Sequence, residues 1–408
     1  MSYGWISNRI SRGHLRHLAL ILGLSLVLGG SQARQALEVT RREKTHEKAI
    51  PAAEFARLIT DFSEEGGYFR SDNFVSNETS YLHIVDRLKE LGASGGAYIG
   101  VGPEQNFTYI AKVRPRIAFI VDIRRQAIIQ HLMFKAIFHH ADTRARFLSM
   151  LFSKPLTGPA PPGADASAED LVGYFSRTAT DNAAFTKNLS LIINTIVRDF
   201  RFLLDPRDRS TLDYVYSTFR DENLDLQYRS GGFGYRPGGY GYPGRGGWGY
   251  FPTLRELILE SDLHGKLGNF LANRGDYEFV RTLQEANRII PIVGDFGGNK
   301  ALPAVSTYLR THGYTVTAFY TSNVEQYLFS GGGFDDFARN VSKLPITERS
   351  LFIRAYPNQR VPHPAQIGNH RLVTLMEKIS VFLDDYRHGL YPDYWTLVRT
   401  HYIGAQEQ

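Results

Sequence analysis

The stretch from Gly95 to Arg125 constrains the fold of this chain more than any other segment. An apolar run at residues 97–99 leads into Gly100-Val101-Gly102. After a helix-length segment, a second apolar run, residues 117–121, ends on Asp122. Glycines let the backbone approach a ligand, and an acidic residue about 20 positions later can accept hydrogen bonds from ribose hydroxyls. Asp122 lies 22 positions after the first glycine of the turn. The stretch therefore predicts a βαβ unit with a nucleotide-like ligand at its first turn.

Strand-like and helix-like segments alternate on both sides of a long helical region. Residues 289–293, 315–320 and 350–354 are short apolar runs separated by segments with helical periodicity. This alternation predicts an α/β fold with a doubly wound, mostly parallel sheet of Rossmann-like type. We expect a first part of this domain at residues 51–140, a large helical insertion at 141–288, and a second part at 289–408.

Two further expectations concern the insertion and the C-terminal end. The insertion contains a glycine- and aromatic-rich loop at residues 230–250, which is either a flexible surface loop or a lid whose rings stack on a ligand. Near the C-terminus, residues 372–386 have the period of an amphipathic helix, and residues 395–402 are expected to form the last strand.

The N-terminus has the features of a secretory signal peptide. Arg9, Arg12 and Arg16 precede an apolar run at residues 18–28, and small residues before position 34 suit cleavage after Ala33. We expect a signal peptide at residues 1–33, a linker at 34–50 and a periplasmic or secreted protein. The alternative is a protein anchored in the membrane by an uncleaved leader. No stable membrane span is expected after leader cleavage, because no other segment reaches the necessary length.

Composition excludes several classes of function. The absence of cysteine removes disulfide frameworks, thiolate metal sites and a cysteine nucleophile, and no histidine cluster has the spacing of a zinc site, so no metal is assigned. The formal charge of +6 falls to +3 without the leader, which gives no support to nucleic-acid binding. The expected partner is a small molecule, and the sequence does not indicate an oligomeric state.

The ends of the predicted strands bring chemically useful residues to one rim of the sheet. Ligands of open α/β sheets bind outside the carboxyl ends of the strands, near the point where the strand order reverses. Here those ends carry Gly100 to Gly102, Asp122, Asp295, Tyr320 to Asn323, and Arg354. This convergence predicts a ligand pocket at the rim.

The arrangement resembles the class I S-adenosylmethionine-dependent methyltransferase fold. The resemblance implies that Gly100, Val101 and Gly102 face the methionine and ribose part of the cofactor and that Asp122 binds the ribose hydroxyls. It also implies that Asp295 lies near the adenine, and that AFYTSNVEQYLF, with Tyr320, Ser322 and Asn323, borders the transferring methyl group. The blocks IGVGPEQNF, FIVDIRR, VGDF and SNVEQYL are similar to those of a bacterial family with this type of fold and no assigned reaction.

Two departures from the methyltransferase pattern narrow the choice of ligand. Tyr98 replaces the acidic residue that commonly precedes the first glycine, and Pro103 and Glu104 occupy the end of the turn where a third small residue is usual. The dinucleotide fingerprint also needs that third glycine, and no phosphate-binding GxxxxGK[ST] is present. The turn therefore favours a ligand without a pyrophosphate.

Several residues have alternative interpretations. Ser322 and Glu325 fit a helix capping box, which would explain both without a function. Glu104 and Asp295 are a possible acid/base pair at the rim. The segment Ser76 to Leu82 repeats the S-N-x-x-x-Y-L pattern of Ser322 to Leu328, either by chance or as a second polar helix start facing the pocket.

Two functional hypotheses follow from the sequence. The first is an S-adenosylmethionine-binding, methyltransferase-like protein with an unknown acceptor, in which Tyr320, Asn323 and Glu104 are the catalytic candidates. The second is an exported binding or structural protein that retains the fold without catalysis, and the leader motivates it. Fold alone does not decide between them.

Overall fold

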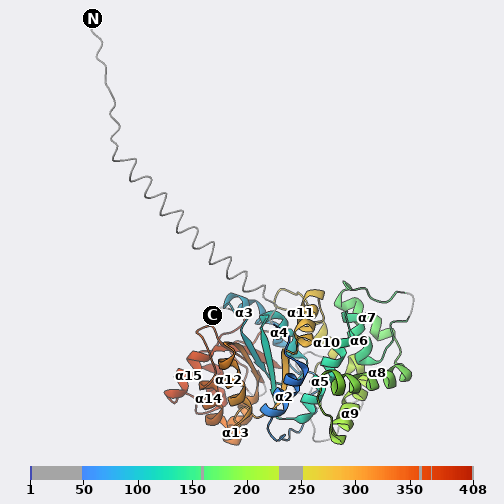
Figure 1. Ribbon diagram of the computed structural model, residues 1–408. Coiled ribbons are helices and arrows are strands. Elements are labelled where there is room, and N and C mark those ends of the chain that lie inside the picture. Colours follow the sequence, from blue (N-terminus) through green and yellow to red (C-terminus); the bar gives the residue numbers. More distant parts are fainter. Residues whose placement is uncertain (2–47, 158–159, 229–250, 358–360, 369, 407–408) are drawn as a thin grey trace. The chain divides into compact units, whose positions relative to one another are not determined.

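The structure is a computed structural model that describes Met1 and residues 48–157, 160–228, 251–357, 361–368 and 370–406. The chain divides into two units, residues 1–48 and 49–408, and every helix and strand given below belongs to the second (Figure 1). The expected signal peptide at 1–33, nearly all of the linker at 34–50 and the loop at 230–250 lie outside the described residues.

A six-stranded sheet forms the centre of the second unit, with the strand order β3-β2-β1-β4-β5-β6. The first five strands pair in parallel, and β6 pairs antiparallel with β5. The strand order reverses between β1 and β4, as in doubly wound Rossmann-like sheets. The predicted α/β class and the mostly parallel sheet are therefore confirmed. The strands are β1 (Ala97–Gly100), β2 (Ile117–Asp122), β3 (Ile289–Val293), β4 (Val316–Ser322), β5 (Leu351–Pro357) and β6 (Leu372–Lys378).

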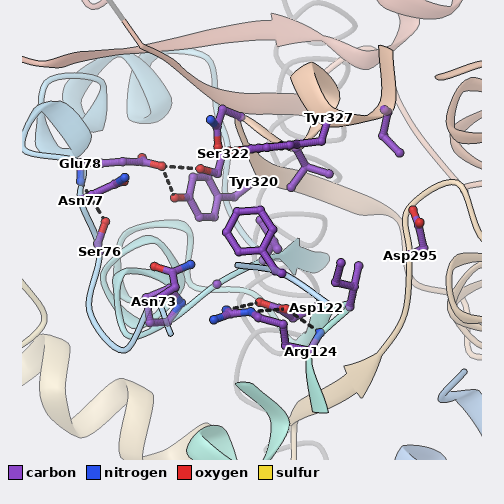
Figure 2. Close-up of a pocket in the computed structure, with 18 of the residues that line it drawn as sticks. Asn73, Ser76, Asn77, Glu78, Asp122, Arg124, Asp295, Tyr320, Ser322 and Tyr327 are labelled. Carbon is purple, nitrogen blue, oxygen red and sulfur yellow. Dashed lines mark hydrogen bonds and ion pairs between the residues drawn. The ribbon is translucent and has the colours of Figure 1, made fainter. Parts of the chain in front are cut away.

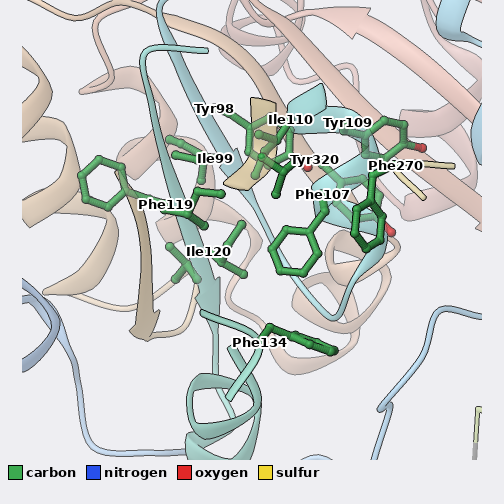
Figure 3. Close-up of a cluster of buried hydrophobic side chains, with 14 of the residues drawn as sticks. Tyr98, Ile99, Phe107, Tyr109, Ile110, Phe119, Ile120, Phe134, Phe270 and Tyr320 are labelled. Carbon is green, nitrogen blue, oxygen red and sulfur yellow. The ribbon is translucent and has the colours of Figure 1, made fainter. Parts of the chain in front are cut away.

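Helices cover both faces of this sheet. The strands β1, β2 and β3 are buried at every position, which explains their continuous apolar sequences. Phe119 of β2 packs against rings of α2 and α12, whereas Phe107 of α4 and Phe134 of α5 lie on the opposite face (Figure 3). The helices around the sheet are α2 (Ala52–Phe62), α3 (Val85–Glu90), α4 (Gln105–Val113), α5 (Arg125–His140), α11 (Arg274–Glu285), α12 (Ala301–Thr311), α13 (Val324–Gly331), α14 (Phe334–Ser342), α15 (Ile379–Arg387) and α16 (Tyr394–Arg399), with a short 3-10 helix, η1 (Ser80–Leu82).

The region between α5 and β3 is helical, as the sequence predicted. Side chains of Thr143, Ser167, Asp181 and Asp205 each accept a backbone hydrogen bond at the start of a helix, so local capping fixes these elements. Helix α9 packs on α5 and α6, which joins the region to the edge of the sheet that β3 forms. Besides α11, the region contains α6 (Arg144–Phe152), α7 (Ala168–Arg177), α8 (Asn182–Asn194), η2 (Thr195–Asp199), α9 (Pro206–Glu222), η3 (Asn223–Asp225) and α10 (Leu254–Ile258).

The C-terminal prediction was correct for residues 379–386, which are helical, and wrong for residues 372–378 and for the expected last strand. Residues 372–386 are a strand, β6, followed by helix α15, and residues 395–402 contain most of helix α16. Residues 372–377 are buried on both faces of the strand, and the apolar residues Leu372, Val373, Leu375 and Met376 are compatible with helical spacing when read from sequence alone. The antiparallel ladder with β5, from Leu351↔Lys378 to Pro357↔Leu372, decided the conformation.

Candidate functional site

A pocket of about 240 Å³ opens at the carboxyl ends of β1, β2 and β4, at the point where the strand order reverses (Figure 2). Its volume is near the lower end of the range for small-molecule sites, roughly 300 Å³. Four groups of residues form the wall: the turn after β1, the residues after β2 and β3, the end of β4 with α13, and a segment that precedes η1. Three of these were predicted. For the fourth, residues 73–78, the sequence offered only the segment from Ser76 onward, as one of two alternatives.

The turn after β1 brings the backbone to the pocket. Val101 and Gly102 line it, and Gly102 has φ +80°, which glycine adopts without strain. The Gly102 carbonyl accepts hydrogen bonds from Nδ2 of Asn106 at 3.1 Å and from Nε2 of His131 at 2.9 Å. Burial lowers the pKa of His131 to about 4, so the ring is neutral and donates from Nε2. These two hydrogen bonds to the Gly102 carbonyl therefore fix the conformation of the turn.

Tyr98, the departure from the methyltransferase pattern, has a structural role at this turn. Its hydroxyl donates to Oδ1 of Asn106 at 2.9 Å, while Nδ2 of Asn106 donates to the carbonyls of Val101 and Pro103 as well as that of Gly102. A Cβ at Gly100 would come within 2.0 Å of Asn106 Oδ1, so this glycine makes room for the Asn106 side chain and does not line the pocket.

Asp122 lies at the end of β2 and lines the pocket as predicted, but its carboxylate is already paired. Arg124 donates to Oδ1 from its backbone N–H and from Nε, and to Oδ2 from Nη2 at 2.7 Å. Burial acts to raise the pKa of Asp122, but the charge and hydrogen bonds of Arg124 outweigh burial and hold the pKa below its usual range. About one of the carboxylate's four acceptor positions stays open.

Asp295 follows β3 and lines the exposed edge of the pocket. Its Oδ1 accepts a hydrogen bond from Gly297 N–H at 2.8 Å, which fixes the turn. The Glu64 carboxylate accepts from the N–H groups of Asp295, Lys300 and Ala301, so it occupies the N-terminal end of α12.

Glu78 is the central acidic residue of the pocket, and sequence reasoning did not select it. Its Oε1 accepts hydrogen bonds from the hydroxyls of Tyr320 at 2.7 Å and Ser322 at 2.5 Å, and its Oε2 accepts from Nε2 of Gln105 at 2.9 Å. Burial raises the pKa of Glu78, although the three hydrogen bonds act in the opposite direction. The only signal in the sequence was the similarity between its segment and residues 322–328.

Tyr320, Ser322 and Asn323 line the pocket, as predicted from the end of β4. The capping-box interpretation of Ser322 and Glu325 was wrong. Ser322 precedes the N-cap Asn323, and its hydroxyl donates to Glu78, whereas Glu325 is fully buried and binds Arg354. Ser322 has φ +53°, a conformation that L-residues adopt at a cost, and it is found at a wall of the pocket.

Glu104 and Arg354 do not line the pocket, although the sequence placed both at the rim. Glu104 is buried behind the segment 73–78, where Oε1 accepts from the backbone N–H of Ser76 at 3.1 Å, and burial raises its pKa to about 7. Arg354 is buried between Glu325 and Glu377. It is not at a strand end, because β5 continues to Pro357.

Two asparagines and two aromatic rings complete the wall. Asn73 and Asn77 line the pocket (Figure 2), and their side-chain amides make no hydrogen bond within the described part of the chain. Phe69 and Tyr327 lie edge to face with ring centroids 5.3 Å apart, and the Tyr327 side chain is partly exposed. No periodic or motif signal in the sequence marks Phe69 or Asn73, whereas Asn77 belongs to the repeated S-N-x-x-x-Y-L pattern.

The electrostatic balance of the pocket is negative. Its described lining residues include three carboxylates, those of Glu78, Asp122 and Asp295, and one cation, Arg124, which is paired with Asp122. Among the residues that the structure describes, no group of three histidine or acidic side chains could hold a metal ion.

No helix in the described part of the chain combines the length and the apolar character needed to cross a membrane.

Fold and site together define an α/β protein with a pocket at the point where the strand order of a Rossmann-like sheet reverses. The chain belongs to the family known as domain of unknown function DUF7790, whose sequence model matches residues 73–155 and 253–402. All of the pocket's described lining except Phe69 falls within the matched residues, whereas α7, α8 and α9 fall outside them. No curated protein matches the chain.

Proposed function

We propose that the pocket binds S-adenosylmethionine and that the protein is methyltransferase-like. The observation that carries the proposal is the meeting of Gly102, Asp122 and Asp295 at one pocket, after three adjacent parallel strands. Gly102 would face the methionine and ribose part of the cofactor. The open acceptor position of Asp122 would bind a ribose hydroxyl, and Asp295 would lie on the adenine side. When bound, S-adenosylmethionine supplies an electrophilic methyl group on its sulfonium sulfur.

The charge of the pocket supports a sulfonium ligand. The lining carries an excess of carboxylates over cations, so a positively charged ligand is attracted and an anionic one is repelled. The cofactor has a cationic sulfur and no phosphate, which agrees with this balance.

The start of α4 gives a second argument against nucleotides with a pyrophosphate. Helix N-termini bind phosphate through free backbone N–H groups. Pro103 has no N–H group, and the N-cap residue Glu104 brings a carboxyl group to this helix end. Phosphate binding is therefore disfavoured at the position where dinucleotide folds place it.

Ligand binding to the full chain tests the proposal. We expect S-adenosylmethionine and S-adenosylhomocysteine to raise the melting temperature, with NAD and ATP as comparison ligands that give no shift. A ligand at 100 times its dissociation constant stabilises by about 2.7 kcal/mol. Absence of a shift with both cofactor forms at millimolar concentration would overturn the proposal.

An exposed carboxylate offers a matched pair of variants for the same experiment. Asp295→Asn keeps an acceptor for Gly297 N–H but removes a charge from the pocket. Asp393→Asn makes the same change at the N-cap of α16, where the side chain accepts from Thr396 N–H. We expect the first to weaken cofactor binding about five-fold, because a charge contact near solvent is worth about 1 kcal/mol. The second should leave binding as in the wild type.

The Asp122–Arg124 pair favours a second candidate, an exported binding or structural protein without catalysis. Three of the acceptor positions of Asp122 are already used, which limits how strongly it can hold a ribose. Under this candidate the pocket takes another small molecule and the cofactor produces no thermal shift. Mass spectrometry of ligands retained after native purification separates the two candidates.

A further inference from the structure

We propose that the end of the pocket around Glu78 binds a primary amine through its protonated nitrogen. The binding claim stands by itself, and only the use of the amine as a methyl acceptor rests on the proposed function.

Glu78 lines the pocket without a cationic partner. Its three hydrogen bonds come from neutral groups, the hydroxyls of Tyr320 and Ser322 and the amide of Gln105. Asp122, the other buried carboxylate of the lining, is neutralised by Arg124. A carboxylate offers about four acceptor positions, so Oε2 of Glu78 retains one that no described residue fills. Because a buried charge is stabilised by an opposite charge, a cationic donor is the complementary ligand.

Acceptor atoms near Glu78 suit the remaining hydrogens of an ammonium group, which has three donors. Asn73 and Asn77 belong to the same segment as Glu78, line the pocket, and have amides without hydrogen bonds among the described residues (Figure 2). Asn323 lines the opposite wall, and its amide makes a long contact of 3.5 Å with Gln326 and a side-chain hydrogen bond with Tyr327. A carboxylate with several carboxamide oxygens matches a primary ammonium better than it matches a hydroxyl with one donor.

The apolar part of the amine has a place in the same wall. Phe69 and Tyr327 lie edge to face and both line the pocket. Aromatic faces attract cations as well as apolar groups. An amine carried on an aromatic or aliphatic body therefore meets suitable surface on the side of the rings.

Proton transfer to Glu78 then follows from its environment. Burial raises the pKa of Glu78, so the carboxylate accepts a proton more readily than a carboxylate in water does. In this step an N–H bond of the ammonium breaks, an O–H bond forms on Glu78, and the nitrogen keeps its lone pair. On the proposed function, this lone pair makes the amine the methyl acceptor.

The pH dependence of binding isolates Glu78. Burial raises the pKa of each neighbouring tyrosine well above its usual value, and burial raises the pKa of Glu104 to about 7. The titratable groups that face Glu78 are Tyr98 of β1, Glu104 and Tyr109 at α4, Tyr320 of β4 and Tyr394 of α16. Of these groups that can ionise below the range of the tyrosines, Glu78 lines the pocket and Glu104 does not. Ammonium binding should therefore strengthen as the pH rises through the pKa of Glu78, which burial raises above its usual value.

Three small probes of one shape test the proposal on the full chain: benzylamine, benzyl alcohol and benzoate. The dissociation constant of each probe is to be measured by calorimetry in the absence of S-adenosylmethionine. We expect benzylamine to bind at least about ten-fold more tightly than benzyl alcohol, since hydrogen bonds to charged groups are worth more than neutral ones. Benzoate should bind most weakly. Benzoate or benzyl alcohol binding as tightly as benzylamine would overturn the proposal, and this outcome needs no variant.

Matched substitutions assign the effect to Glu78. Glu78→Gln should weaken benzylamine binding about ten-fold and remove its pH dependence. Glu104→Gln should keep the pH dependence, and Glu377→Gln, a buried carboxylate that does not line the pocket, should keep the affinity. A folded Glu78→Gln protein with wild-type benzylamine affinity contradicts the proposal.

The two proposals fail separately. Benzylamine binding without any response to S-adenosylmethionine would leave the amine site intact and remove the proposed function. A response to the cofactor with no preference for benzylamine would do the reverse.

Discussion

The hydroxyl of Ser322 donates a hydrogen bond of 2.5 Å to Oε1 of Glu78, and so joins two segments that are similar in sequence. Both segments bring a Ser-Asn pair to the pocket, residues 76–77 and residues 322–323. The similarity ends further along, because Tyr327 lines the pocket whereas the Tyr81 hydroxyl is buried and donates to the carbonyl of Leu257. Two polar segments from distant parts of the chain thus form facing walls of one site.

Removing this contact should destabilise the protein measurably. Ser322→Ala deletes one of three donors to a buried carboxylate, and we expect a loss of about 1–3 kcal/mol in the free energy of unfolding. Ser330→Ala on the following helix, α13, is the control, because its exposed hydroxyl donates to the carbonyl of Gln326. The control should stay within about 0.5 kcal/mol of the wild type in urea unfolding. Equal values for the two variants would show that the contact does not stabilise the fold.

A second prediction concerns the turn after β1. Tyr98→Phe removes the donor to Oδ1 of Asn106 and leaves this buried oxygen unsatisfied, which should cost about 1–3 kcal/mol. The matched control is Tyr109→Phe, since Tyr109 is equally buried but its hydroxyl accepts only a long bond of 3.4 Å from Gln105. We expect the control to cost less. Because Asn106 holds the carbonyls of the turn, Tyr98→Phe should also weaken ligand binding at Gly102, measured by calorimetry.

The sequence predicted the first half of the site because its signals are local. The apolar runs around Gly102 and Asp122 and the spacing between them lie within one βαβ unit, so strand ends could be placed correctly. Glu78 escaped prediction because nothing in its own neighbourhood shows that it faces Tyr320, a residue 242 positions away. Arg354 was misplaced for a different reason: three more residues of β5 follow it, so its side chain points into the core and not to the rim.

Glu104 should make stability depend on pH. Burial raises its folded pKa to about 7 from 4.5. The contribution of Glu104 to the free energy of unfolding is therefore complete below about pH 4.5 and is lost as the pH rises through about 7. The loss is at most about 3 kcal/mol. Glu104→Gln keeps an acceptor for Ser76 N–H and cannot ionise, so its free energy of unfolding should fall less between pH 5 and pH 8. Glu90→Gln, at an exposed site of α3, should follow the wild-type curve. Parallel curves for Glu104→Gln and the wild type would contradict the assignment.

Arg354 tests whether the interior beneath β4, β5 and β6 is separate from the pocket. Its guanidinium pairs with Glu325 at 2.8 Å and with Glu377, and all three side chains are almost completely buried. Arg354→Met should cost about 3–5 kcal/mol, because it leaves two carboxylates buried without a cation. Adding Glu325→Gln and Glu377→Gln should recover much of this loss, since amides need no counter-charge.

The control is Arg57→Met at an exposed pair with Asp61, which should change stability by less than about 1 kcal/mol. The triple variant, if folded, should bind the pocket's ligands as the wild type does, because none of its three sites lines the pocket. Loss of ligand binding in a folded triple variant would show that Arg354 and its two partners contribute to the functional site.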